Sequence, residues 1–182
     1  MLRRALSATI VALIFAALMS AAGATVARAD ACAAADAVPG DDAARAQAAR
    51  AVLCLVNRAR VAQHMRQVRF SRSLGAAARF HGADMVANGF FSHEGSAGDD
   101  LAARVRASGY SGSHPGSSAS ETLVWGTDVS PRDLVQDLLQ SGEHRRIVLD
   151  PRQRSVGLGL VLGAPLAGVA LPSATLVLDF GD

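Results

Sequence analysis

Two histidines and a glutamate, far apart in the chain, are the residues whose chemistry stands out. His93 ends the run Phe-Phe-Ser-His, His144 lies within Ser-Gly-Glu-His-Arg, and Glu121 lies between them. Two imidazoles and a carboxylate are the usual parts of a polar cavity or of a divalent-metal site. We therefore take His93, Glu121 and His144 as candidate ligands for zinc or another divalent cation, provided that the fold brings them together.

Residues 1–29 have the pattern of a secretory signal peptide. Arg3 and Arg4 precede an apolar run over residues 5–22, and small residues around Ala29 form a cleavage site. An uncleaved membrane anchor is the competing interpretation, since the run approaches the ~20 residues that span a bilayer. The small residues at its end favour removal, so we predict a secreted, extracellular or cell-envelope protein without a stable membrane span.

The rest of the chain has the size of one domain and little net charge. Removing Arg3, Arg4 and Arg28 from the 18 basic residues leaves 15 arginines against 16 acidic residues. This balance gives no electrostatic reason to expect nucleic acid or an anionic membrane as a partner. A chain of this length buries a core without a second domain.

The chain has two cysteines, Cys32 and Cys54. Export would place them where disulfides persist, so we predict one bridge from the N-terminal segment to the first helix. Such a bridge contributes about 3 kcal/mol on the chain-entropy account. In the alternative, Cys54 is a small buried hydrophobe and Cys32 is a free thiol.

Local signals predict helices first and strands last. Residues 30–42 read as a flexible N-terminal segment, and the domain covers residues 43–182. Helical spacing and caps predict helices over 43–63, 71–88 and 100–107 and another starting at 131, with a loop over 111–120. Strands are expected over 121–125, 156–162 and 174–180, with the last two forming a hairpin. This order indicates an α+β fold with an antiparallel sheet, not a doubly wound parallel one.

Glycines alternate with larger apolar residues in the strand over 156–162. Gly157 and Gly159 share one face of it. Glycines on one face indicate that a helix or a ligand approaches that face closely. On the helix over 71–88, His81 falls on the apolar stripe with Leu74 and Met85, which predicts a core histidine with satisfied hydrogen bonds.

Several short motifs occur in an order that resembles one known family. They are Leu55-Val56-Asn57 with Arg60, Asp84-Met85, Phe91-Ser92-His93, Arg104, Gly109-Tyr110, Glu121, Ser141, His144-Arg145, Leu149-Asp150-Pro151 and Val156-Gly157-Leu158-Gly159. Together they resemble bacterial members of the CAP superfamily, the cysteine-rich secretory, antigen 5 and pathogenesis-related group with SCP-like domains. The resemblance covers nearly the whole chain after the leader.

The resemblance implies an α-β-α sandwich, with a central antiparallel sheet between helices, and a cavity lined by histidines and acids. The matching cavity residues are His93, Glu121 and His144. Many relatives have a second cavity glutamate, and this chain has Ser141 there, with Glu143 as another replacement.

Other positions depart from the family pattern as well. Ser120 and Thr122 stand where Gly and Asn are common, Leu138 stands where an aromatic residue is common, and His64 and Glu143 stand where Gly is common. His64 lies just past the first helix, where glycine eases a left-handed turn, so mild strain is expected there.

Three functions fit these residues. The first, which we take as the prediction, is a secreted binding module for a small apolar or lipid-like ligand or an extracellular protein partner, with no cofactor required and zinc as an optional occupant. The alternative is a metal-dependent hydrolase using His93, Glu121 and His144. The third makes Ser141 a nucleophile with His144 as base, but it has neither a nucleophile-elbow sequence nor a third member. The sequence leaves the ligand, the oligomeric state and retention at the envelope open.

Overall fold

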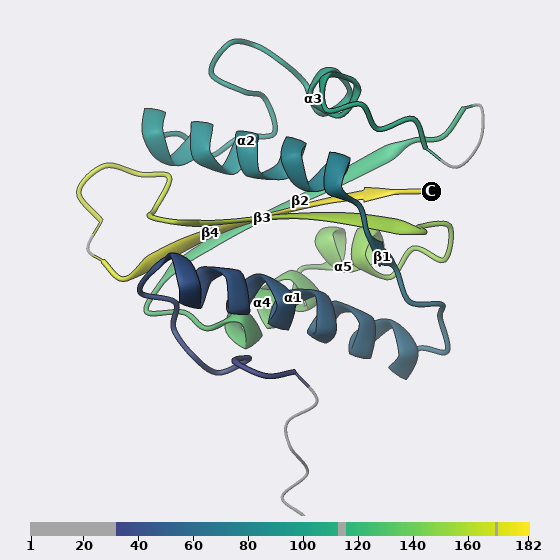
Figure 1. The fold of residues 1–182 in the computed structure, drawn as a ribbon, viewed down its shortest axis with the longest axis horizontal. Helices are drawn as coiled ribbons and strands as arrows, with labels where there is room; N and C mark the ends of the chain where they lie inside the picture. Colours follow the sequence, from purple (N-terminus) through teal and green to yellow (C-terminus); the bar gives the residue numbers. More distant parts are fainter. Residues whose placement is uncertain (1–31, 113–115, 170) are drawn as a thin grey trace, which may run out of the picture.

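The computed structural model describes residues 32–112, 116–169 and 171–182. The predicted signal peptide lies outside the described residues. The elements are α1 (Asp42–Ala62), β1 (Arg69–Phe70), α2 (Arg72–Asn88), α3 (Leu101–Ala107), β2 (Ala119–Thr127), α4 (Pro131–Gln140), α5 (Gly142–Val148), β3 (Ser155–Leu162) and β4 (Ser173–Gly181). They form three layers, with α2 and α3 on one side of the sheet and α1, α4 and α5 on the other (Figure 1).

The sheet confirms the predicted α+β sandwich. Its strand order is β1-β3-β4-β2, and the three long strands are antiparallel, with β3 and β4 forming the expected hairpin. The two-residue strand β1 pairs with β3 in parallel, which makes the sheet mixed. A strand of two residues is too short to show an alternating pattern, so the sequence did not predict it.

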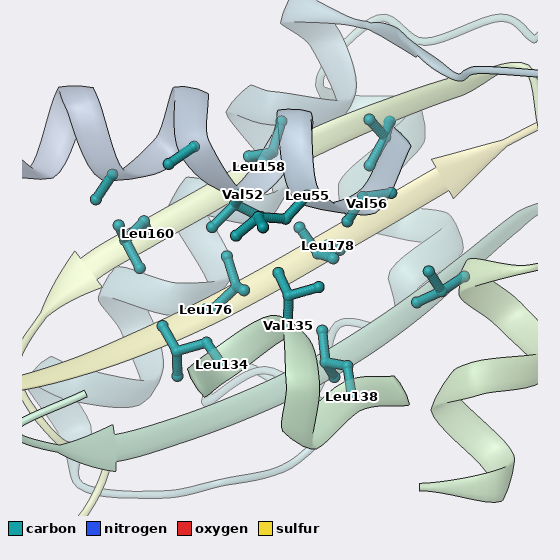
Figure 2. Close-up of a cluster of buried hydrophobic side chains, with 14 of the residues drawn as sticks. Val52, Leu55, Val56, Leu134, Val135, Leu138, Leu158, Leu160, Leu176 and Leu178 are labelled. Carbon is teal, nitrogen blue, oxygen red and sulfur yellow. The ribbon is translucent and has the colours of Figure 1, made fainter. Parts of the chain in front are cut away.

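The larger core lies between the sheet and the layer of α1 and α4. Apolar side chains from α1, α4, β3 and β4 meet there, among them Val52, Leu55, Val56, Leu134, Val135, Leu138, Leu158, Leu160, Leu176 and Leu178 (Figure 2). Successive strand residues point to opposite faces. The leucines of β3 therefore face α1, and its glycines face α2.

The glycine face of β3 lies directly against a helix, which is one of the two predicted neighbours, a helix or a ligand. A Cβ atom at Gly157 would overlap the backbone of Leu74, and one at Gly159 would overlap the backbone of Ala78. Both contacts are with α2, which therefore lies unusually close to the sheet. This contact fixes the position of α2.

Local capping signals place the helix ends where the sequence predicted them. Ser71 caps α2 and Gly89 ends it in the left-handed conformation with φ 68°. Ser130 forms a capping box with Asp133, and Pro131 follows it. His64 has φ 57°, which confirms the predicted left-handed turn after α1.

The described N-terminal segment is tied to α1. Cys32 and Cys54 form a disulfide with a Cα–Cα distance of 5.5 Å, which confirms the predicted bridge. Within the described residues, no helix is both long and apolar enough to cross a membrane.

Candidate functional site

Glu121 on β2 is the centre of a buried polar network. Its side chain is 1% exposed. Oε1 accepts a hydrogen bond from Nδ1 of His93 at 2.7 Å, and Oε2 accepts one from Nη2 of Arg104 at 3.0 Å. Both carboxylate oxygens are thus engaged by cationic or polar partners, as a buried charge requires.

Arg104 on α3 connects this network to the loop before that helix. Its side chain is buried; Nη1 donates to the backbone oxygen of Asp99 at 2.8 Å, and Nη2 also donates to that of His93 at 3.0 Å. One guanidinium therefore holds both ends of the segment 93–99 and the carboxylate of Glu121. In the sequence, Arg104 is one of the family motifs, and nothing in its local pattern assigns it to the site.

His93 lies at the exposed edge of the network. Its side chain is 59% exposed, and the bond to Glu121 makes Nδ1 the donor, so that in the neutral ring Nε2 is the acceptor nitrogen. His93 and Glu121 line a cavity of about 500 Å³ together with Glu94, Asp100 and Leu101. A ligand in this cavity can approach the imidazole, while the carboxylate behind it fixes the ring.

His144 lies near His93 but outside that cavity lining. It is half-buried on α5, and burial lowers its pKa, with the charge of Glu143 raising the pKa and that of His93 lowering it. The hydroxyl of Ser141 accepts the backbone N–H of His144 at 3.4 Å, so it caps α5. Glu143 is exposed. The structure thus joins His93 and Glu121 directly and brings His144 within electrostatic range of His93.

His93, Glu121 and His144 are the candidate metal ligands, and their surroundings differ. In the part of the chain that is described, no three His, Cys, Asp or Glu side chains form a group that could hold an ion. Both oxygens of Glu121 already accept hydrogen bonds, so this residue suits the role of a carboxylate that orients a metal-binding histidine. Nε2 of His93 and the imidazole of His144 are the nitrogens that remain for a cation.

His81 on α2 lies beneath this site. It is fully buried, as expected for a core histidine, and its Nε2 donates to the backbone oxygen of Ser92 at 2.8 Å. Its Nδ1 has no hydrogen-bond partner among the described residues, so the expected satisfaction of both ring nitrogens is met only at Nε2. The same nitrogen lies 3.9 Å from Oε1 of Glu121. Burial is the main cause that lowers the pKa of His81, so the ring is neutral and adds no charge beside Arg104.

Asp179 on β4 is a site residue that the sequence analysis missed. It is 0% exposed and lies directly opposite Glu121 in the β2–β4 ladder. Burial, then the charge of Glu121 and a side-chain hydrogen bond with it, raise the pKa of Asp179 to about 8. Neither carboxyl oxygen of Asp179 accepts a hydrogen bond from a described residue. An ionised carboxylate would need such donors, so their absence among these residues agrees with a protonated acid. A single acid within the buried run Leu-Val-Leu-Asp-Phe was the available signal.

Comparison with known proteins identifies the family. The profile of the cysteine-rich secretory protein family, CAP, matches residues 53–171, more than half of the chain, so the protein belongs to that family. A search of curated proteins found no match. The sequence-level resemblance to the CAP superfamily is thereby confirmed.

Solved structures with the same fold come from several bacteria. An extracellular protein with an SCP domain from Bacillus anthracis aligns with a TM-score of 0.60 and 19% identity, over 77% of this chain and 44% of that one. An outer surface protein from Borrelia burgdorferi aligns with a TM-score of 0.59 and 11% identity, over 75% and 92%. A cysteine-rich secretory protein from Staphylococcus aureus aligns with a TM-score of 0.52 and 11% identity, over 73% and 38%. At these identities the likeness establishes the fold, and the chain spans less than half of the Bacillus protein.

Proposed function

We propose that this chain is an exported CAP-domain binding module that takes a small apolar or lipid-like ligand in a groove between α2 and α3. The groove has a volume of about 500 Å³ and is lined mainly by Ala76, Ala77 and Phe80 of α2 and by Ala103 and Ala107 of α3. Pockets for small molecules have volumes of roughly 300–1,000 Å³ and mostly apolar walls. The Phe80 side chain is 63% exposed, and burial under a ligand would remove that apolar surface from water.

One observation connects this groove to the histidine site. Arg104 lines the groove and also donates to Glu121, which in turn accepts from His93. Asp99, which accepts from Arg104, also lines the groove. A ligand in the groove would therefore contact the residues that hold His93 in place, and this coupling is the main support for the proposal.

The roles of the polar groups favour binding over hydrolysis. A metal-dependent hydrolase needs a carboxylate or imidazole that is free to move a proton. Glu121 uses both oxygens to hold Arg104 and His93, and Ser141 uses its hydroxyl as a helix cap. These residues therefore position their neighbours. We propose His93 and His144 as the nitrogens that would take a divalent cation, as an optional part of the site.

Export to the outside of the cell or to the envelope belongs to the same proposal. It is supported by the leader pattern of residues 1–29 and by neighbours in fold that are described as extracellular or as outer surface proteins. The disulfide agrees with an oxidising compartment. An extracellular protein partner is the alternative ligand, and it would bind the surface around the groove between α2 and α3.

A matched pair of variants on one helix tests the groove. Ala76→Glu would place a charge in the groove, whereas Ala83→Glu would place the same charge on the exposed surface of the same helix outside it. We expect a fluorescent fatty acid to bind the parent and Ala83→Glu with similar affinity and Ala76→Glu at least about tenfold more weakly. Equal binding by all three, or no saturable binding to the parent, would refute the groove as the ligand site.

A further inference from the structure

Three arginines line a second cleft beside the start of β3. The cleft has a volume of about 380 Å³ and is lined by Arg66, Gln67, Arg69, Tyr110, Arg154 and Ser155. Its segments come from the chain after α1, from the chain after α3 and from the start of β3, which lie together near the right-hand end of the sheet in Figure 1. No acidic residue is among those that line it.

The walls of this cleft are fixed by one buried side chain. Arg60 is 0% exposed, and its Nε donates to the backbone oxygen of Arg66 at 2.9 Å. Its Nη2 donates to the backbone oxygen of Gln153 at 3.4 Å, and its Nη1 donates to that of Val148 at 2.6 Å. The two segments that carry Arg66 and Arg154 are thus held to the same guanidinium.

Further bonds hold the remaining wall. Asn57 donates to the backbone oxygen of Val68 at 3.1 Å and accepts its N–H at 2.8 Å. The N–H of Arg69 donates to the backbone oxygen of Arg154 at 2.9 Å, and Arg69 is paired with Ser155 in the β1–β3 ladder. The backbone positions of all three arginines are therefore set by the fold.

The guanidinium groups keep donors available. Arg66 and Arg69 are exposed and make no side-chain hydrogen bond or ion pair within the described part of the chain. Arg154 uses Nη1 to donate to the backbone oxygens of Pro151 and Gln153, which leaves its other nitrogens for a ligand. Three positive charges converging on one cleft repel each other, and an anion would relieve that repulsion.

Asp182 is bonded to residues beside the cleft. Asp182 accepts the hydroxyl of Tyr110 through its backbone oxygen at 3.3 Å. Its carboxylate accepts from the N–H of Ser118 at 2.8 Å and from the hydroxyl of Ser118 at 3.3 Å. Asp182 thus holds Tyr110 in the wall of the cleft and is not itself one of the residues that line it.

We propose that this cleft binds a phosphate or sulfate group, with Arg66, Arg69 and Arg154 as its charged contacts. Arginine presents a planar fork that matches the paired oxygens of such tetrahedral anions and gives charge-assisted hydrogen bonds. Gln67 and Ser155 add neutral donors. The cleft does not involve the groove between α2 and α3, so this site is independent of the proposed apolar ligand.

Titration by NMR with inorganic phosphate, pyrophosphate and sulfate at constant ionic strength tests the proposal. We expect saturable shifts at the backbone amides of Arg69, Tyr110 and Ser155. Arg66→Gln and Arg69→Gln should each weaken binding by about tenfold. Arg50→Gln, which removes an exposed arginine from α1 outside the cleft, should leave the affinity within about twofold.

The two anion classes and the control give distinct results. Binding of phosphate or pyrophosphate but not sulfate would identify a phosphorylated ligand, and the reverse would identify a sulfated one. Shifts that never saturate, or an equal loss of affinity in Arg50→Gln, would show only general attraction to a cationic surface and would overturn the proposal. The side chains of Arg66 and Arg69 bond no described residue, so both variants should unfold like the parent. Unfolding curves of each variant check this.

Discussion

Glu121 and Asp179 face each other across the β2–β4 ladder, so two carboxyl groups lie side by side in the protein interior. Two such groups do not both ionise at this spacing without a large cost. Arg104 pairs with Glu121, which carries the negative charge, and Asp179 keeps its proton at neutral pH because its pKa is raised to about 8. The ionisation of Asp179 therefore sets the total charge of the buried group of Glu121, Arg104 and Asp179, which His93 contacts.

Replacing Asp179 with asparagine should remove a pH dependence of stability. The native protein keeps a proton on Asp179 that the unfolded chain releases above the ordinary pKa of 3.8. The stabilising effect of this proton is complete below pH 3.8 and is lost as the pH rises through about 8. The slope is at most about 1.4 kcal/mol per pH unit.

Urea unfolding of the parent and of Asp179→Asn across this pH range measures the effect. We expect the variant to be the more stable protein near pH 8 and to show a flatter curve. Asp137→Asn, which changes an exposed acid on α4, should retain the slope of the parent. The same slope in Asp179→Asn would mean that the carboxyl group is ionised in the native state.

Replacing Arg104 with methionine should destabilise the domain by about 3–5 kcal/mol, because it leaves the buried charge of Glu121 uncompensated. Chemical denaturation measures this loss, with Arg106→Met on the exposed side of the same helix as the control. Adding Glu121→Gln to Arg104→Met should recover part of the stability. A cost no larger than that of Arg106→Met would argue against a structural ion pair.

The helix ends were predictable because they depend on residues that are close together in the sequence. Ser71 and Gly89 bound α2, and Ser130 with Pro131 starts α4, through bonds and backbone preferences that span only a few positions. Gly159 likewise predicted the close approach of a helix or a ligand, and the structure shows that α2 is that neighbour.

The candidate site was predictable only in part. The family motifs predicted that His93 and Glu121 meet, and they form a hydrogen bond. The parts played by Arg104 and Asp179 depend on how α3 packs and on the pairing of β2 with β4, which no local pattern specifies. The sequence therefore supplied His93 and Glu121 and left out Arg104, which pairs with Glu121, and the buried acid Asp179 beside it.

The two histidines should control metal uptake. His93→Ala and His144→Ala should each abolish binding of Zn²⁺ or Cu²⁺ in calorimetric titration. Glu121→Gln should weaken it by about 10–100-fold, because the imidazole of His93 would lose its orienting carboxylate. The lowered pKa of His144 keeps this ring neutral, and so available to a metal, at a lower pH than a free imidazole.

His64→Asn is the matched control for this titration. It removes an exposed histidine just after the C-terminal end of α1 and places there a residue that tolerates the left-handed backbone. Metal uptake should be unchanged in this variant. Equal uptake by the parent and by both alanine variants would exclude His93 and His144 as ligands.

Adding one methyl group at Gly159 should displace α2 and weaken the groove together with the fold. The new Cβ would overlap the backbone of Ala78, which has no side-chain rotation available to make room. We expect Gly159→Ala to cost about 1–3 kcal/mol or more in urea unfolding. Gly142→Ala should be neutral or slightly stabilising, because a Cβ there meets nothing within 4 Å and lies in α5.

Since α2 also carries Ala76 and Phe80, Gly159→Ala should bind the fluorescent fatty acid more weakly even where it is fully folded. Parent-like affinity in a destabilised Gly159→Ala would show that the groove does not depend on the contact between α2 and the sheet.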